Sequence, residues 1–277
     1  MRIPKYWAHG KYLLRDKYSF FAWRWSDTSL AEAQQLANDK AREIALKFQN
    51  GQRLDRYTYD RNPIREEIIR AIKNDSGKEL GILTRNTYGA LVLNAASAMF
   101  IDIDFPEKNS LANGIGKLFG NKAPSPEQVH LQHVEQWSQK NPAWGLRVYR
   151  TFGGLRCLVT NEIFDPTQES SLAVLRELKS DPLYITLCKQ QESFRARLTP
   201  KPWRCGIHNP PSRYPWDDLR QEQVYRQWEN KYNQTSARFA TCRLVKQIGR
   251  DETHPDVEPI LRLHDDMSCA VDNRNLA

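Results

Sequence analysis

The chain has 277 residues, of which 40% are hydrophobic, and its 41 Lys and Arg outnumber its 33 Asp and Glu to give a net charge of +8. This length and composition allow a real core, in one large domain or two smaller ones. The basic excess favours anionic partners, although charge alone does not separate nucleic acid, nucleotides and membrane surfaces. The longest apolar stretch is too short to span a bilayer and the start lacks a continuous apolar segment, so we expect a cytoplasmic protein without a membrane partner.

The five cysteines are odd in number and widely scattered, without a C-x-x-C pair. This argues against a disulfide framework and predicts reduced thiols. Cys205 and His208 have the spacing of two zinc ligands, but the neighbouring sequence does not complete a set of four, so we do not expect a zinc site.

Residues 1–98 are expected to alternate strands and helices in an N-terminal α/β module. The helices are indicated by apolar stripes at helical spacing and by residues that favour a helix start. The predicted elements are a strand at 17–25, a helix at 29–48 capped by Ser26 or Asp27, a strand at 56–60, a helix at 63–72 begun by Pro63, and a hairpin at 79–94 turning near Asn86.

Residues 99–205 are expected to form a split βαβ core, also called ferredoxin-like or RRM-like, because the predicted order is β-α-β-β-α-β. The elements are a strand at 99–105, a Gly-rich loop at 107–125, a helix at 126–140, a hairpin of 144–151 and 155–160, a helix at 167–180 and a strand at 193–200. A Pro-rich connector and a helical tail, expected to pack on this core, complete the chain over 206–277. The fold class is therefore α/β (α+β).

Two aspartates interrupt the apolar strand MFIDIDF. Because side chains alternate across a strand, Asp102 and Asp104 share one face, where two like charges need a compensating cation. Carboxylates so placed can share Mg²⁺ or Mn²⁺. In the split βαβ sheet the first strand lies between the third and the fourth, which predicts Arg156 on one side and Arg195 and Arg197 on the other. These arginines are the expected phosphate ligands, and an exposed face of cross-strand ion pairs is the structural alternative.

The segment SFRARLTPKPWR adds Lys201 and Arg204 and contains no acid. A basic run of this kind suggests an anion site or a nucleic-acid track with Trp203 available to stack on a base, and a solvated basic loop is the alternative. We add Arg85, on the predicted turn, and Arg150, in the first strand of the predicted hairpin, to the candidate phosphate ligands.

These motifs resemble the archaeo-eukaryotic primase superfamily, whose core is an RRM-like palm preceded by an α/β module. FIDIDF is similar to its hydrophobic D-x-D strand, so the resemblance implies Asp102 and Asp104 as metal ligands. YRTFGGLRCLV is similar to its Ser-Gly-x-Gly-x-His segment, with Gly154 at the glycine and Arg156 where the family has a histidine that contacts nucleotide phosphates. The family's third acid, on a later strand, has no counterpart in SFRARLTP. The candidate catalytic residues are therefore Asp102, Asp104 and Arg156.

Two other functions remain open. Haloacid-dehalogenase phosphatases also use a D-x-D strand, and in chain order Thr160, Lys201, Asp265 and Asp266 offer their later residues, although Phe105 and Pro106 stand where that family has Gly-Thr. A non-catalytic RRM-like module would instead hold nucleic acid on aromatic side chains of its sheet. Our expectation is a metal-dependent nucleotidyl- or phosphoryl-transfer protein that acts on a nucleotide or nucleic acid.

Overall fold

The computed structural model describes residues 1–52, 63–106 and 124–277. The predicted strand at 56–60 lies outside these ranges, as does nearly all of the predicted loop at 107–125. The mixed α/β class expected from the sequence is confirmed. In the part of the chain that the structure describes, no helix is both long and apolar enough to cross a bilayer.

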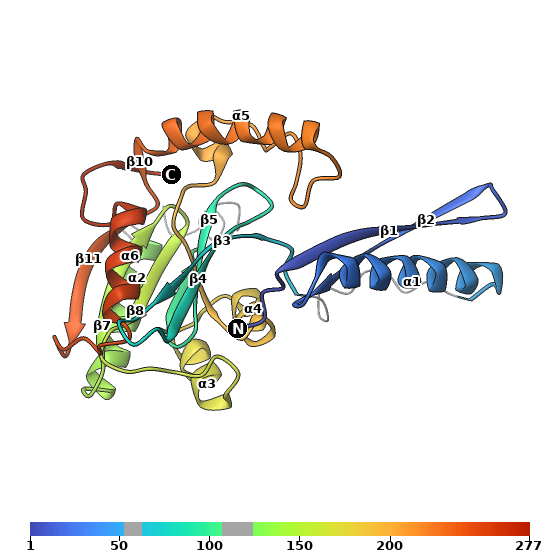
Figure 1. Ribbon diagram of the computed structural model, residues 1–277. Helices are drawn as coiled ribbons and strands as arrows, with labels where there is room; N and C mark the ends of the chain where they lie inside the picture. Colours follow the sequence, from blue (N-terminus) through green and yellow to red (C-terminus); the bar gives the residue numbers. More distant parts are fainter. Residues whose placement is uncertain (53–62, 107–123) are drawn as a thin grey trace, which may run out of the picture.

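One four-stranded antiparallel sheet, with strand order β11-β7-β8-β6, contains the aspartate strand (Figure 1). The hairpin predicted at Phe152 to Gly154 is confirmed and joins its two central strands. The strands are β6 (Phe100–Asp104), β7 (Gly145–Thr151), β8 (Gly154–Val159) and β11 (Cys242–Gly249). The helices between and after them are α2 (Pro126–Lys140), α3 (Glu169–Glu177) and α4 (Pro182–Gln191).

The second sheet, with strand order β3-β4-β5-β9, is built from residues distant in the sequence. Its strands are β3 (Glu67–Lys73), β4 (Glu79–Arg85), β5 (Leu91–Ala95) and β9 (Phe194–Arg197). The predicted hairpin at 79–94 is confirmed as β4 and β5. The helix predicted at 63–72 is wrong, because this segment forms β3, whose Ile68, Ile69 and Ile72 are β-branched and favour a strand.

The expected split βαβ sheet is only partly present. β6, β8 and β7 follow its order, but β9 pairs with β5 and forms no ladder with β6. The reason is that other groups occupy the free edge of β6. The carbonyl of Asp102 accepts hydrogen bonds from the Asp181 amide (3.0 Å) and the Ser180 hydroxyl (2.8 Å), and the carbonyl of Phe100 accepts one from the Tyr184 hydroxyl (2.8 Å).

The sequence predicts a helical tail, but the C-terminal part of the structure also contains strands. It contains α5 (Leu219–Ser236) and α6 (Glu258–Ser268), but also β11 and the short parallel pair β10 (Phe239–Ala240) and β12 (Asn275–Leu276). In β11, Cys242 and Leu244 alternate with exposed residues, which is the pattern of a half-buried strand. β11 extends the aspartate sheet beyond β7, so this sheet includes residues from the predicted tail.

Helix α6 links the two sheets through a shared core. The Cδ1 atom of Ile260 lies 3.2 Å from the position that a Cβ at Gly81 of β4 would take, and the His264 ring packs on Phe100 of β6 with centroids 5.1 Å apart. One hydrophobic cluster contains residues of both sheets and of α6. The N-terminal half of α6 thus contacts one sheet and its C-terminal half contacts the other.

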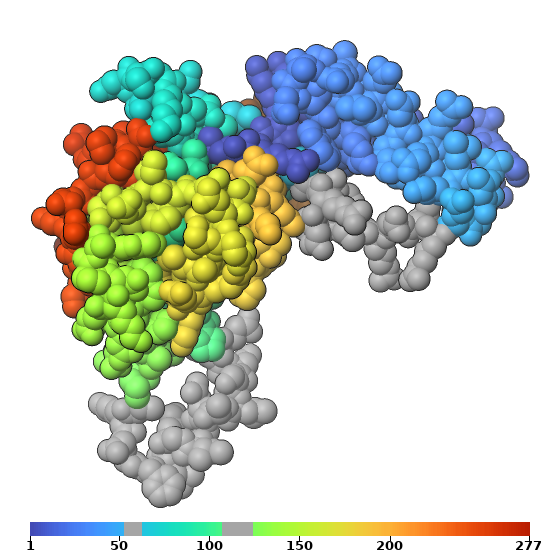
Figure 2. All heavy atoms as spheres, turned by 90° about the horizontal axis from the view of Figure 1, so that it is seen from below, coloured from blue at the N-terminus to red at the C-terminus, as the bar shows by residue number. Residues whose placement is uncertain are grey.

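The N-terminal residues form a separate unit that extends from one side of the molecule, drawn in blue (Figures 1 and 2). A hairpin of β1 (Tyr6–Leu14) and β2 (Tyr18–Ser26) packs on α1 (Leu30–Gln49). β1 was not predicted from the sequence. The cap of α1 is Ser29 rather than Ser26 or Asp27, because the Ser29 hydroxyl accepts a hydrogen bond from the Glu32 amide at 3.2 Å.

Candidate functional site

Asp102 and Asp104 lie on the same face of β6, as the alternation of side chains predicts. Asp102 is opposite Arg156 in the β6–β8 ladder, and Asp104 is opposite Gly154. The Asp102 carboxylate is 3.6 Å from Nε of Arg156, so this predicted neighbour is confirmed. Phe100, on the same face, is fully buried, whereas Asp104 is exposed. The face therefore opens toward solvent along the strand from Phe100 to Asp104.

Arg156 lies behind Asp102 and is only 3% exposed. Its Nη1 donates to the Arg197 carbonyl at 2.9 Å and lies 3.4 Å from Nε2 of His264. Its Nε has no hydrogen-bond partner, since Asp102 is just beyond that range. A guanidinium this buried is placed to hold Asp102 rather than to meet a ligand directly.

His264 connects Arg156 to a buried network on α6 and β7. Its Nδ1 lies 2.9 Å from Asp265, and Asp265 also accepts hydrogen bonds from Tyr149 (2.8 Å) and Arg147 (2.6 Å). Burial, reinforced by the nearby Arg156 and Arg147, lowers the pKa of His264 to about 4. Neutral His264 therefore donates from Nδ1 to Asp265 and accepts at Nε2 from Arg156. The sequence analysis did not identify this network, because its members lie on elements far apart in the chain.

Three cations are close enough to the two aspartates for the charges of the two groups to affect each other's pKa values. Arg197 ends β9, Lys201 follows it, and Arg204 lies on the 3₁₀ turn η3 (Pro202–Cys205). Burial and the charges of Arg156 and Arg204 lower the pKa of Arg197 to about 10, and burial together with Arg197 and Arg204 lowers the pKa of Lys201. These groups repel one another, so an anion near them would be stabilised.

The carboxylates on and beside β6 also repel one another, but with negative charge. Partial desolvation of its carboxylate by neighbouring groups, the charge of Asp102 and the charge of Asp181 raise the pKa of Asp104, against the opposing influence of Lys201 and Arg197. Asp181 caps α4, and its side chain accepts a hydrogen bond from the Leu183 amide at 2.8 Å. Asp181 could not be identified from the sequence, because only the return of the chain from α3 brings it to β6. A cation near Asp104 would offset this repulsion.

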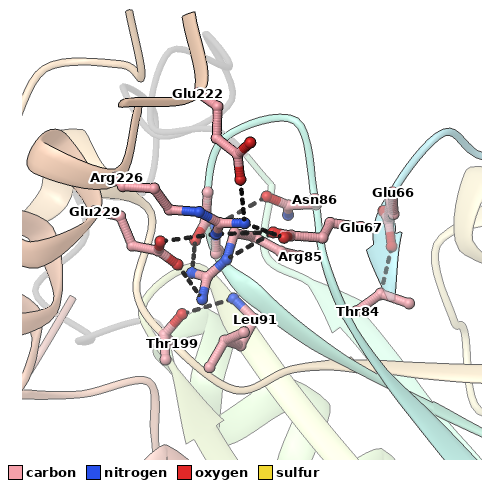
Figure 3. A network of polar contacts seen from close by, with 12 residues as sticks. Glu66, Glu67, Thr84, Arg85, Asn86, Leu91, Thr199, Glu222, Arg226 and Glu229 are labelled. Carbon is pink, nitrogen blue, oxygen red and sulfur yellow. Dashed lines mark hydrogen bonds and ion pairs between the residues drawn. The ribbon is translucent and has the colours of Figure 1, made fainter. Parts of the chain in front are cut away.

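Three candidate phosphate ligands are not brought to this face. Arg195 pairs with Glu66 at 2.7 Å, and Arg150 lies on the opposite face of β7, where it pairs with Glu127 at 3.0 Å. Figure 3 shows Arg85 in a separate network, with Glu229 at 2.5 Å and Glu67 at 3.6 Å. All three guanidinium groups already have carboxylate partners, so they join structural elements to one another rather than bind phosphate.

Gly154 allows the hairpin to approach the aspartate strand. A Cβ at this position would lie 1.9 Å from the Ile103 carbonyl oxygen, whereas a Cβ at Gly153 would meet only Arg204, at 3.9 Å. We expect Gly154→Ala to destabilise the fold by about 1–3 kcal/mol or more, because β8 must move away from β6. Gly153→Ala is the matched control and should stay close to wild type. Urea unfolding checks both variants, and equal stabilities would contradict the close approach.

The donor set at β6 fits a magnesium-type site that is completed by a ligand. Within residues 1–52, 63–106 and 124–277, no group of three or more His, Cys, Asp and Glu side chains is arranged to hold a metal ion. Mg²⁺, however, is commonly bound by one or two carboxylates together with substrate phosphates and water, rather than by a cage of protein ligands. Asp102 and Asp104, with cations next to them, match that requirement.

Comparison with known proteins gives no match: no family model, no curated protein and no solved structure is significantly similar to this chain. The resemblance to primases therefore stays an expectation that rests on two motifs, and the function has to be argued from the residues of the site.

Proposed function

We propose that this protein binds a nucleotide, free or within a nucleic acid, through Mg²⁺ or Mn²⁺ held by Asp102 and Asp104, and carries out metal-dependent phosphoryl or nucleotidyl transfer there. The observation that carries the proposal is that a group of like-charged carboxylates and a group of like-charged cations are close enough to influence each other's pKa values. Aspartates repel one another on β6, and Arg197, Lys201 and Arg204 repel one another beside them. A metal ion with its phosphate ligand offsets both repulsions at once.

Each residue has a distinct part in this proposal. Asp102 and Asp104 hold the metal ion, which when bound supplies positive charge to the phosphate oxygens. Lys201 and Arg204 hold the phosphate groups, and Arg197 adds charge from the end of β9. Arg156 is a positioning residue, because it contacts Asp102 from its buried side and is itself held by His264. The five cysteines are free thiols, which is compatible with the cytoplasmic location that we propose.

The two alternative functions have less support in the geometry. An RRM-like module needs an open aromatic sheet face, but His264 packs on Phe100 and Tyr149, with centroids 5.1 and 4.8 Å away, and covers that part of the sheet. A haloacid-dehalogenase phosphatase needs its later residues beside the D-x-D strand. Here Thr160 is buried, Asp265 pairs with Arg147 at 2.6 Å, and β6 runs antiparallel to β8.

Calorimetric titration of Mn²⁺, with and without a nucleoside triphosphate, tests the proposal. We expect the wild type to bind Mn²⁺ more tightly when the triphosphate is present. The Asp102→Asn/Asp104→Asn variant should bind the metal and nucleotide together more weakly, on the order of 10- to 100-fold, because the remaining amides carry no charge.

The control is Asp266→Asn, which alters an exposed aspartate at the end of α6. This variant should bind as the wild type does, and thermal unfolding establishes that all the proteins are folded. If the double variant binds Mn²⁺ and nucleotide as tightly as the wild type, or if the wild type binds neither, the metal site is refuted.

A further inference from the structure

Three exposed aromatic side chains from separate loops lie around the cations of the candidate site. Tyr88 lies between β4 and β5, Phe152 between β7 and β8, and Trp203 on η3, and they are 42%, 52% and 46% exposed. Large aromatic side chains usually bury most of their surface, so three of them beside one charged site call for an explanation.

Their contacts form one continuous surface. The Tyr88 and Trp203 rings are in edge-to-face contact with centroids 5.2 Å apart, and Nζ of Lys201 lies 5.4 Å from the Trp203 centroid. On the other side, the guanidinium of Arg204 lies 4.2 Å from the Phe152 centroid. The Arg204 amide donates a hydrogen bond to the Lys201 carbonyl at 2.9 Å, so the two cations are on one turn and the surface runs from Tyr88 through them to Phe152.

This alternation of rings and cations matches the chemistry of one kind of ligand. A single strand of nucleic acid offers unpaired bases, which stack on aromatic rings, and phosphates, which pair with Lys and Arg. In a duplex the base faces are already stacked and are closed to side chains. The segment 193–204 contains no acid that would repel the backbone. These rings and cations therefore suit a single strand of nucleic acid rather than a duplex.

We propose that Tyr88, Phe152 and Trp203, together with Lys201 and Arg204, bind single-stranded nucleic acid next to the Asp102 and Asp104 site. The inference deepens the proposed function, on which it rests, by naming the substrate class of that site. The strand lies with bases on Trp203 and Phe152 and with its backbone along Lys201 and Arg204. A phosphate held by these cations then lies beside the two aspartates.

The test is fluorescence anisotropy of a labelled single-stranded oligonucleotide of mixed sequence, measured in EDTA so that no metal contributes. We expect Trp203→Ala and Phe152→Ala each to weaken binding by roughly 5- to 100-fold, because each removes one stacking platform. Phe21→Ala is the matched control, since Phe21 is 50% exposed but lies on the N-terminal hairpin. Lys201→Gln should also lower the salt dependence of binding by about 0.7 in logarithmic slope.

The outcomes separate this inference from the proposed function. Asp102→Asn/Asp104→Asn should bind the strand in EDTA at least as tightly as the wild type, because it removes two negative charges beside the phosphate, while it loses metal and nucleotide binding. If Trp203→Ala and Phe152→Ala both bind like Phe21→Ala, or if a duplex of the same sequence binds as tightly as the strand, the inference is overturned even where metal and nucleotide binding holds. If strand binding follows the expectation and metal binding does not, only the metal site fails.

Discussion

Replacing Arg195 by methionine is expected to destabilise the protein by about 3–5 kcal/mol, because it leaves a carboxylate buried without its partner. Glu66 is 4% exposed, and it accepts hydrogen bonds from Arg195 at 2.7 Å and from the Thr84 hydroxyl at 2.6 Å. Arg195 also donates to Asn94 at 2.5 Å. The variant thus removes the group that joins β9, β5 and the chain before β3. Urea unfolding measures the loss.

Two further variants sharpen this prediction. Arg176→Ala breaks an exposed pair with Glu169 and should cost about 0–1 kcal/mol. Glu66→Gln/Arg195→Met removes both charges and should recover part of the stability lost by Arg195→Met alone, because no carboxylate stays unpaired. Metal and nucleotide binding by folded Arg195→Met should equal that of the wild type. A selective loss of nucleotide binding with unchanged stability would restore Arg195 as a phosphate ligand and contradict its structural role.

Stability is expected to fall by about 2 kcal/mol between pH 7.5 and pH 5 through His264 alone. The pKa of His264 is lowered to about 4 in the folded protein, from an ordinary value of 6.5, mainly by burial. Between these two values the unfolded chain binds a proton that the folded chain excludes, so stability rises with pH. The contribution is complete above pH 6.5 and is lost as the pH falls toward 4.

The groups that face His264 are Arg147 and Tyr149 of β7, Arg156 of β8, Cys242 of β11 and Asp265 of α6. Among them, Asp265 has a lowered pKa, so its own contribution is lost only at lower pH. Urea unfolding at the two pH values compares the wild type with His264→Gln, which removes the titration.

The variant His208→Gln alters an exposed histidine and is the control. His264→Gln should show a smaller fall in stability than the wild type by about 2 kcal/mol, whereas His208→Gln should follow the wild type. Equal pH dependence in all three proteins would mean that His264 titrates normally in the folded state.

Local patterns predicted most of the single elements. The apolar stripe of α1, the proline that begins α2, the double glycine after β7 and the alternation in β6 each placed an element correctly. The errors at β3 and β11 have one cause. Both segments contain charged residues at positions that fit an exposed helix face as well as the solvent side of a strand, so only the strand partners β4 and β7 decide between the two.

Some features of the candidate site could likewise be predicted from local patterns, and others depend on the tertiary structure. The sequence by itself determined that Asp102 and Asp104 share a face, because alternation along a strand is a local property. The split βαβ strand order also predicted Arg156 as a neighbour, and in the structure Arg156 lies opposite Asp102. Only the tertiary structure decided that β9 pairs with β5, that Arg195 is neutralised by Glu66, and that α6 brings His264 against Arg156. These contacts join residues about a hundred positions apart or more. Which of them form depends on which strand edges and helix faces are left free once the whole chain is packed.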